Sequence, residues 1–138
     1  MTDIQAAVGR KQLERMADIV TRRREIAARY TSSFAELDGI EPPAEPSWAR
    51  SNYQSYTVGL SDELDQRDVM QALLERGIAS RRGIMNAHRE VPYQGDHHLP
   101  VSEWAQDRHI VLPLYPTMDD ADIDAVITAV VEVVRRQA

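Results

Sequence analysis

The residue types best suited to ligand chemistry gather in one stretch of the second half of the chain. Arg81 and Arg82 carry planar donor groups that match the oxygens of phosphate or carboxylate. Asn86, His88 and Tyr93 follow and can hydrogen-bond sugar hydroxyls. The stretch therefore suits an anionic, polar ligand. The residues alone leave an alternative open, in which the arginines end a strand, one solvated and the other in a surface ion pair.

Other kinds of site are poorly supported. His88, His97 and His98 share this stretch, but adjacent histidines in an extended segment point apart, and only Glu90 and Asp96 lie near them. We therefore expect no metal site. The sequence contains no P-loop, no G-x-G-x-x-G fingerprint, no H-E-x-x-H pair and no nucleophile elbow. Cysteine is absent, which excludes disulfides and thiolate ligands.

The composition indicates an ordinary globular protein. A length of 138 residues suits a single domain, residues 1–138. The net charge of −6 argues against nucleic-acid partners, because phosphate contacts need a basic surface. No apolar run is long enough for a membrane span and no leader opens the chain, so we expect a cytoplasmic protein without a membrane partner.

The chain is predicted to begin with one long helix over residues 1–37. Thr2 is a good N-cap, and Gln5 three residues later completes a capping box. Apolar residues then recur at helical spacing, with a bend expected near Leu13. Gly39 ends this helix, and the prolines that follow prevent its continuation.

Residues 38–138 are predicted to form a small sheet with further helices. Strands are expected at residues 55–60, 78–82 and 109–112, and helices at 66–76 and at 100–108. A final helix is expected near the end of the chain, capped by either Thr117 or Asp119. Residues 83–99 are left as an irregular loop, which in a compact domain is usually functional or disordered. The fold class is α+β, with a three-stranded, mainly antiparallel sheet covered by helices.

Several stretches together resemble the DegT/StrS-type sugar aminotransferases. They occur in the same order and at similar spacing as in that family, and together they cover nearly the whole chain. They are residues 1–9 followed by Gln12 and Leu13, residues 22–27 with Tyr30, Ser55 with Tyr56, Gly77 with Ile78, Ala87 with His88, Leu99 with Pro100, and residues 112–116.

The resemblance implies a role in an enzyme that depends on pyridoxal phosphate. The family has the aspartate-aminotransferase fold and works as dimers on nucleotide-linked keto-sugars, with an amino acid as the amino donor. A large domain holds the cofactor, and a small C-terminal domain, which this chain resembles, closes over it. By the same resemblance, Arg81, Asn86, His88 and Tyr93 are the expected substrate-binding residues.

The one lysine of the chain does not match the lysine that the family's chemistry requires. The cofactor aldehyde condenses with a lysine amine, which in the family lies before the helix that this chain begins with. Lys11 is no counterpart. We therefore expect no catalytic or cofactor-binding residue here, no cofactor on this chain alone, and no transamination without a large domain that binds pyridoxal phosphate.

Two interpretations follow. In the first, this chain is the C-terminal part of a sugar aminotransferase that needs the missing large domain for activity. In the alternative, it is a stand-alone, non-catalytic domain that dimerises or binds a small ligand. In either case, a small domain without a large one exposes apolar surface, so we expect a homo-oligomer or a complement with a large cofactor-binding domain.

Overall fold

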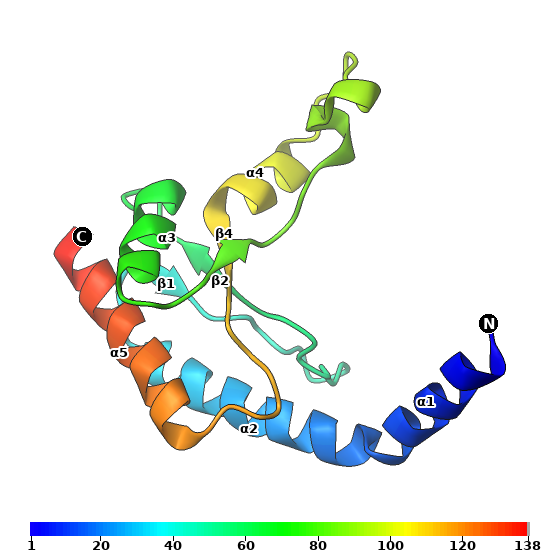
Figure 1. Ribbon diagram of the computed structural model, residues 1–138. Helices are drawn as coiled ribbons and strands as arrows, with labels where there is room; N and C mark the ends of the chain where they lie inside the picture. The colour runs from blue at the N-terminus through cyan, green and yellow to red at the C-terminus, as the bar shows by residue number, and fades with distance from the viewer. Residues whose placement is uncertain (138) are drawn as a thin grey trace.

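Two helices in tandem open the chain in the computed structural model, which describes residues 1–137 (Figure 1). Helix α1 spans Asp3–Glu14 and helix α2 spans Met16–Phe34. The predicted capping box is confirmed: Thr2 Oγ1 accepts from the Gln5 N–H at 3.3 Å, and Gln5 Oε1 accepts from the Thr2 N–H at 2.9 Å. The predicted bend occurs at Arg15, where one helix gives way to the next.

A four-stranded antiparallel sheet lies beside α2. The strands are β1 (Ile40–Glu41), β2 (Tyr56–Leu60), β3 (Arg81–Arg82) and β4 (His109–Leu112), in the order β1-β2-β4-β3. All of the pairings are antiparallel. The prediction of an α+β fold with an antiparallel sheet is confirmed, but the count of three strands is wrong. Strand β1 was missed because two residues show no alternating pattern.

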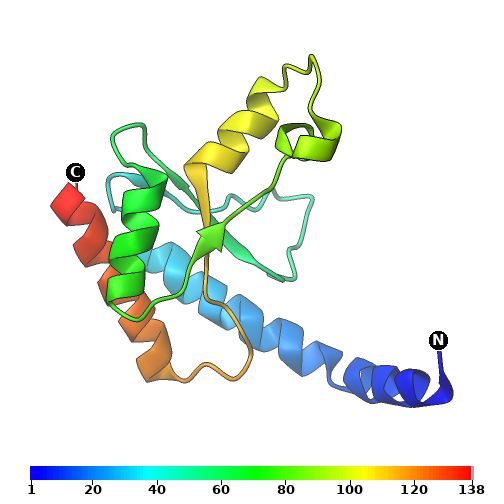
Figure 2. The same cartoon turned by 45° about the horizontal axis from the view of Figure 1, so that its top comes forward.

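Three helices cover one face of the sheet. Helix α5 (Asp120–Gln137) packs against both α2 and α3 (Gln66–Glu75), while α4 (Pro100–Arg108) stands apart and runs directly into β4 (Figure 2). Alternate strand residues face the helices, because strand side chains alternate between the two faces. The buried side chains of this core include Ile26, Tyr30 and Phe34 of α2, Val58 of β2, Leu73 of α3, Ile110 of β4, and Ile123 and Val130 of α5.

Aromatic side chains in contact with one another fix α2 against the sheet. The Tyr30 ring lies 5.9 Å from Phe34 and 5.2 Å from Tyr56 between ring centroids. The Tyr30 hydroxyl donates to the Pro113 carbonyl at 2.9 Å, and the Tyr56 hydroxyl shares a hydrogen bond with Thr31 at 2.9 Å. Burial raises the pKa of Tyr30 above its ordinary value and that of Tyr56 to about 12. Both rings are therefore neutral core groups with satisfied hydroxyls.

Short polar caps begin helices α3 and α5. Asp65 Oδ1 accepts from the Arg67 N–H at 2.8 Å at the start of α3. Asp119 and Asp122 bond each other's backbone N–H groups at the start of α5. Caps of this kind satisfy N–H groups that have no partner inside the helix. They place α3 and α5 where the sequence predicts them.

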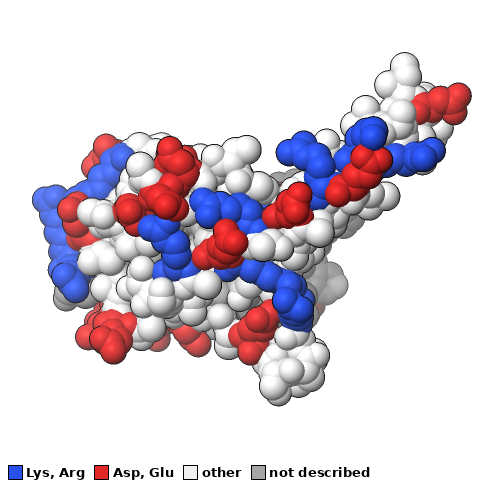
Figure 3. All heavy atoms as spheres, turned by 90° about the horizontal axis from the view of Figure 1, so that it is seen from below, with Lys and Arg blue, Asp and Glu red and all other residues white. Residues whose placement is uncertain are grey.

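Helix α1 projects away from the body of the molecule (Figure 1). No residue of α1 is buried, and its apolar side chains Ile4, Val8 and Leu13 are 78%, 57% and 68% exposed. Over the described residues 1–137, no helix is long and apolar enough to cross a membrane. Figure 3 shows basic and acidic side chains interspersed on the face seen from below, as expected from pairs such as Arg29 with Asp120.

A loop clamped onto helix α4

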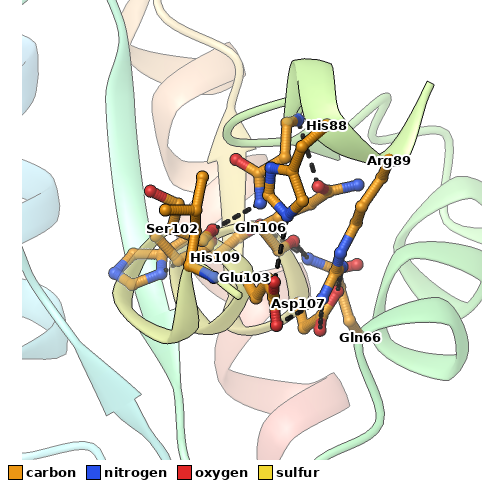
Figure 4. Close-up of polar contacts among 11 residues, drawn as sticks. Gln66, His88, Arg89, Ser102, Glu103, Gln106, Asp107 and His109 are labelled. Carbon is orange, nitrogen blue, oxygen red and sulfur yellow. Dashed lines mark hydrogen bonds and ion pairs between the residues drawn. The ribbon is translucent and has the colours of Figure 1, made fainter. Parts of the chain in front are cut away.

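The loop of residues 83–99 is held in place by α4. It contains two short helical turns, η1 (Ala87–Arg89) and η2 (Val91–Tyr93). Asn86 is 6% exposed; its backbone N–H donates to Gln106 Oε1 at 3.1 Å, and its side-chain amide donates to the Ser102 carbonyl at 2.7 Å (Figure 4). Buried polar groups need such partners. Asn86 therefore anchors the start of the loop.

A histidine–carboxylate pair forms the second tie. His88 Nε2 lies 3.0 Å from Glu103 Oε1 (Figure 4), and the His88 side chain is 11% exposed. The same Glu103 oxygen accepts from the Leu99 N–H at 3.1 Å. The pKa of Glu103 lies below its ordinary value, because the hydrogen bond from the Leu99 N–H and, to a smaller extent, the one from His88 stabilise the carboxylate. Glu103 is therefore a carboxylate that joins His88 to the start of α4.

An arginine makes the third tie. Arg89 donates two hydrogen bonds to the Asp107 carboxylate, at 2.6 and 3.0 Å. The hydrogen bonds from Arg89 lower the pKa of Asp107. One guanidinium nitrogen of Arg89, Nη2, also lies 3.9 Å from Glu103 Oε2. Paired donors of this geometry fix orientation as well as position.

Gln66 connects α3 to the C-terminal end of α4. Its buried side-chain amide donates to the carbonyls of Gln106 and His109, each at 2.8 Å. These carbonyls lie where α4 passes into β4. The loop, α4 and the sheet are thus linked through one set of polar contacts.

A hollow of about 410 Å³ opens beside the clamped loop. Three of the predicted site residues line it, namely Asn86, His88 and Tyr93. Tyr93 is 67% exposed. The residues that line the hollow are Met85, Asn86, Ala87, His88, Tyr93, His97, Leu99 and Ser102. Mixed apolar and hydrogen-bonding walls are typical of small-molecule sites. The Asn86 side-chain amide already donates to the Ser102 carbonyl, so Asn86 forms part of the wall of this hollow.

Arg81 lies elsewhere. It is exposed on β3 opposite Val111 and lines a different hollow of about 390 Å³, together with Ser55 and Leu114. Arg82, its neighbour on the strand, faces the opposite way because strand side chains alternate. Within residues 1–137 neither guanidinium forms an ion pair with a carboxylate. The structure thus separates Arg81 from the three residues of the loop hollow.

Sequence reasoning missed the partners that hold the loop. Glu103, Gln106 and Asp107 come 15 to 20 residues after the groups they bind, a spacing with no local signature. One signal was present, because an acidic residue in the first turn of a helix, such as Glu103, is favoured there and can bond backbone N–H groups. In the described part of the chain, no three histidine or acidic side chains gather as a metal site would require.

Comparison with known proteins shows the family. Residues 1–131 match the sequence pattern of the DegT/DnrJ/EryC1/StrS aminotransferase family. The chain belongs to this family. It is 36% identical over 125 residues to a dTDP-4-dehydro-2,3,6-trideoxy-D-glucose 4-aminotransferase from Saccharopolyspora spinosa, an alignment that covers 90% of this chain and 32% of that enzyme.

Solved structures agree with this assignment. The aminotransferase TlmJ from Streptoalloteichus hindustanus superposes with a TM-score of 0.92 at 30% identity, over 99% of this chain and 37% of TlmJ. The putative sugar aminotransferase Spr1654 from Streptococcus pneumoniae, in its PLP form, superposes with a TM-score of 0.89 at 26% identity. This superposition covers 100% of this chain and 37% of Spr1654. The chain thus spans about a third of the length of these relatives.

Proposed function

We propose that this chain is the small, C-terminal domain of a sugar aminotransferase dependent on pyridoxal phosphate, and that it presents the 83–99 loop to a nucleotide-linked keto-sugar. The family match over residues 1–131 carries this proposal, together with the finding that the chain covers about a third of the length of its relative from S. spinosa. The relative from S. spinosa is named for a dTDP-linked substrate. The hollow beside the loop supplies an imidazole, a phenol and apolar walls for such a ligand.

In this proposal the described residues supply no lysine for pyridoxal phosphate. Lys11, the one lysine, is on the exposed helix α1, where its side chain is 76% exposed. Its ammonium pairs with Glu14 at 2.9 Å, and it lines none of the hollows described above. A lysine that condenses with the cofactor needs a desolvated or otherwise activated amine. In our proposal the cofactor and its lysine belong to the remaining two thirds of the enzyme.

The loop hollow should bind a nucleotide sugar weakly by itself. We expect dTDP-glucose at millimolar concentration to shift the amide NMR signals of residues 85–102 in the isolated chain. The variants His88→Ala and Tyr93→Ala should each weaken this binding about two- to tenfold, because each removes one or two ligand contacts worth roughly 1 kcal/mol. Arg81 lines a different hollow, so Arg81→Ala should leave binding in the loop hollow unchanged.

The control for this titration is His98→Ala, which removes an exposed histidine that does not line the hollow. Its affinity should equal that of the parent chain. If dTDP-glucose shifts only signals outside residues 85–102, or if the substitutions at His88 and Tyr93 both leave binding unchanged, the proposed site is wrong.

We further propose that the apolar face of α1 is covered in the complete enzyme and drives self-association of the 138-residue chain. Ile4 and Val8 are four residues apart and so share one helix face. Exposed apolar patches of this kind mark interaction surfaces. The alternative function, a stand-alone dimerisation domain, would use the same face.

Sedimentation velocity measures this association. The parent chain should sediment as a dimer or larger species at high concentration, and the double variant I4Q/V8Q should shift toward the monomer. The matched control V101Q replaces a valine that is 77% exposed on α4 and should leave sedimentation unchanged. A parent chain that stays monomeric would contradict the proposed role of α1.

A further inference from the structure

The two hydrogen-bonded histidines of the α4 region carry their protons on different ring nitrogens. His109 Nδ1 lies 3.0 Å from the Ala105 carbonyl oxygen, and a carbonyl can only accept. His109 therefore bears a proton on Nδ1. His88 instead places Nε2 3.0 Å from Glu103 Oε1. The lowered pKa of Glu103 keeps this group a carboxylate at neutral pH, which also can only accept. His88 therefore bears a proton on Nε2.

The second ring nitrogen of His88 is then left for a ligand. Within residues 1–137, His88 Nδ1 has no hydrogen-bond partner, and it is not among the buried polar atoms that lack one. His88 also lines the loop hollow of about 410 Å³. In a neutral imidazole with Nε2 protonated, Nδ1 is an acceptor. The group it meets in the hollow must therefore be a donor, such as a sugar hydroxyl.

Glu103 is itself held in place on several sides. It accepts from the Leu99 N–H at 3.1 Å, and Arg89, which is fixed by Asp107, lies 3.9 Å away (Figure 4). A carboxylate bonded to the far nitrogen of a functional imidazole sets both the tautomer and the ring orientation. The Leu99 bond also places this carboxylate at the start of α4, so the orientation of His88 is coupled to the helix.

From these contacts we propose that Glu103 is a positioning residue: it fixes His88 as the Nε2–H tautomer and so makes Nδ1 a hydrogen-bond acceptor in the ligand hollow. The part of this inference that concerns a sugar hydroxyl rests on the proposed function. The tautomer itself does not, because it follows from the contacts of the chain without a ligand. The two parts can therefore fail separately.

Long-range ¹H–¹⁵N NMR of the histidine rings tests the tautomer in the isolated chain. The spectrum is recorded at a pH about two units above the ordinary histidine pKa of about 6.5. His88 should show a proton on Nε2 alone, while His109 should show the opposite pattern and serves as an internal control. A His88 ring protonated on Nδ1, or still on both nitrogens at that pH, would overturn the proposal.

Two substitutions separate positioning from simple support of the fold. In Glu103→Ala, His88 should change to the mixed tautomers of a solvated ring, whereas the His109 pattern should persist. In Glu103→Gln, the amide oxygen can still accept from Nε2–H, so the single tautomer should be restored. If Glu103→Ala leaves His88 in one Nε2–H form, another group sets the tautomer and the proposal fails.

Addition of dTDP-glucose then tests the ligand part. The ¹⁵N signal of His88 Nδ1 should move on binding while that of Nε2 stays nearly constant, and Glu103→Ala should weaken binding about three- to tenfold. Binding that leaves the Nδ1 signal unmoved would refute the acceptor role. No binding by any variant, with the tautomer as predicted, would refute the proposed function and leave the assignment of Glu103 intact.

Discussion

Tyr30→Ala should reduce the free energy of unfolding by about 3–5 kcal/mol, the typical cost of deleting a buried aromatic side chain. Tyr30 is fully buried between Phe34 and Tyr56, and its hydroxyl bonds the Pro113 carbonyl. The substitution would leave a cavity between α2 and the sheet and an unpaired carbonyl. Because domains of this size have only about 5–15 kcal/mol of stability, the loss should be evident in a urea titration.

Two controls divide this effect into its parts. Tyr30→Phe keeps the ring and removes only the hydroxyl bond, so it should cost about 1 kcal/mol. Tyr93→Ala makes the same truncation at a tyrosine that is 67% exposed, and should change stability by no more than about 0.5 kcal/mol. A cost for Tyr30→Ala no larger than that of the Tyr93 control would contradict the described core.

Asn86→Ala should release the 83–99 loop without unfolding the rest of the domain. The variant loses the 2.7 Å bond from the Asn86 amide to the Ser102 carbonyl and leaves a buried space beside Gln106. The loss of a buried hydrogen bond of this kind costs about 1–3 kcal/mol. Amide hydrogen exchange in residues 84–99 should therefore accelerate by roughly 5- to 150-fold.

The matched control for this experiment is Asn52→Ala, at the other asparagine of the chain, which is exposed and bonds only the Gln54 N–H. Amide hydrogen exchange in the 83–99 loop of Asn52→Ala should be the same as in the parent chain. Loop exchange unchanged in Asn86→Ala would mean that the ties through His88 and Arg89 suffice, and that Asn86 is not an anchor.

The sequence was sufficient to predict the elements whose signals are local. The capping box at Thr2 marks the start of α1 within a few residues. The β-rich run before Leu60 likewise predicted β2. These features depend on neighbours along the chain, which a sequence displays directly.

The parts that could not be predicted depend on tertiary contacts. Strand β1 exists because Ile40 and Glu41 pair with the end of β2, and two residues carry no periodic pattern of their own. The ties of the loop join groups such as His88 and Glu103, 15 residues apart. For the same reason, the sequence could place Arg81 near Asn86 along the chain but could not show that they line different hollows.

We propose that this domain serves a sugar aminotransferase while the cofactor lysine lies in another part of that enzyme. The most direct test is to incubate the purified chain with pyridoxal phosphate, reduce it with borohydride and measure the intact mass and the modified peptides. We expect only partial, non-saturating labelling of exposed amines, namely Lys11 and the N-terminus. Saturable labelling of Lys11 at one cofactor per chain, accompanied by transamination, would contradict the account.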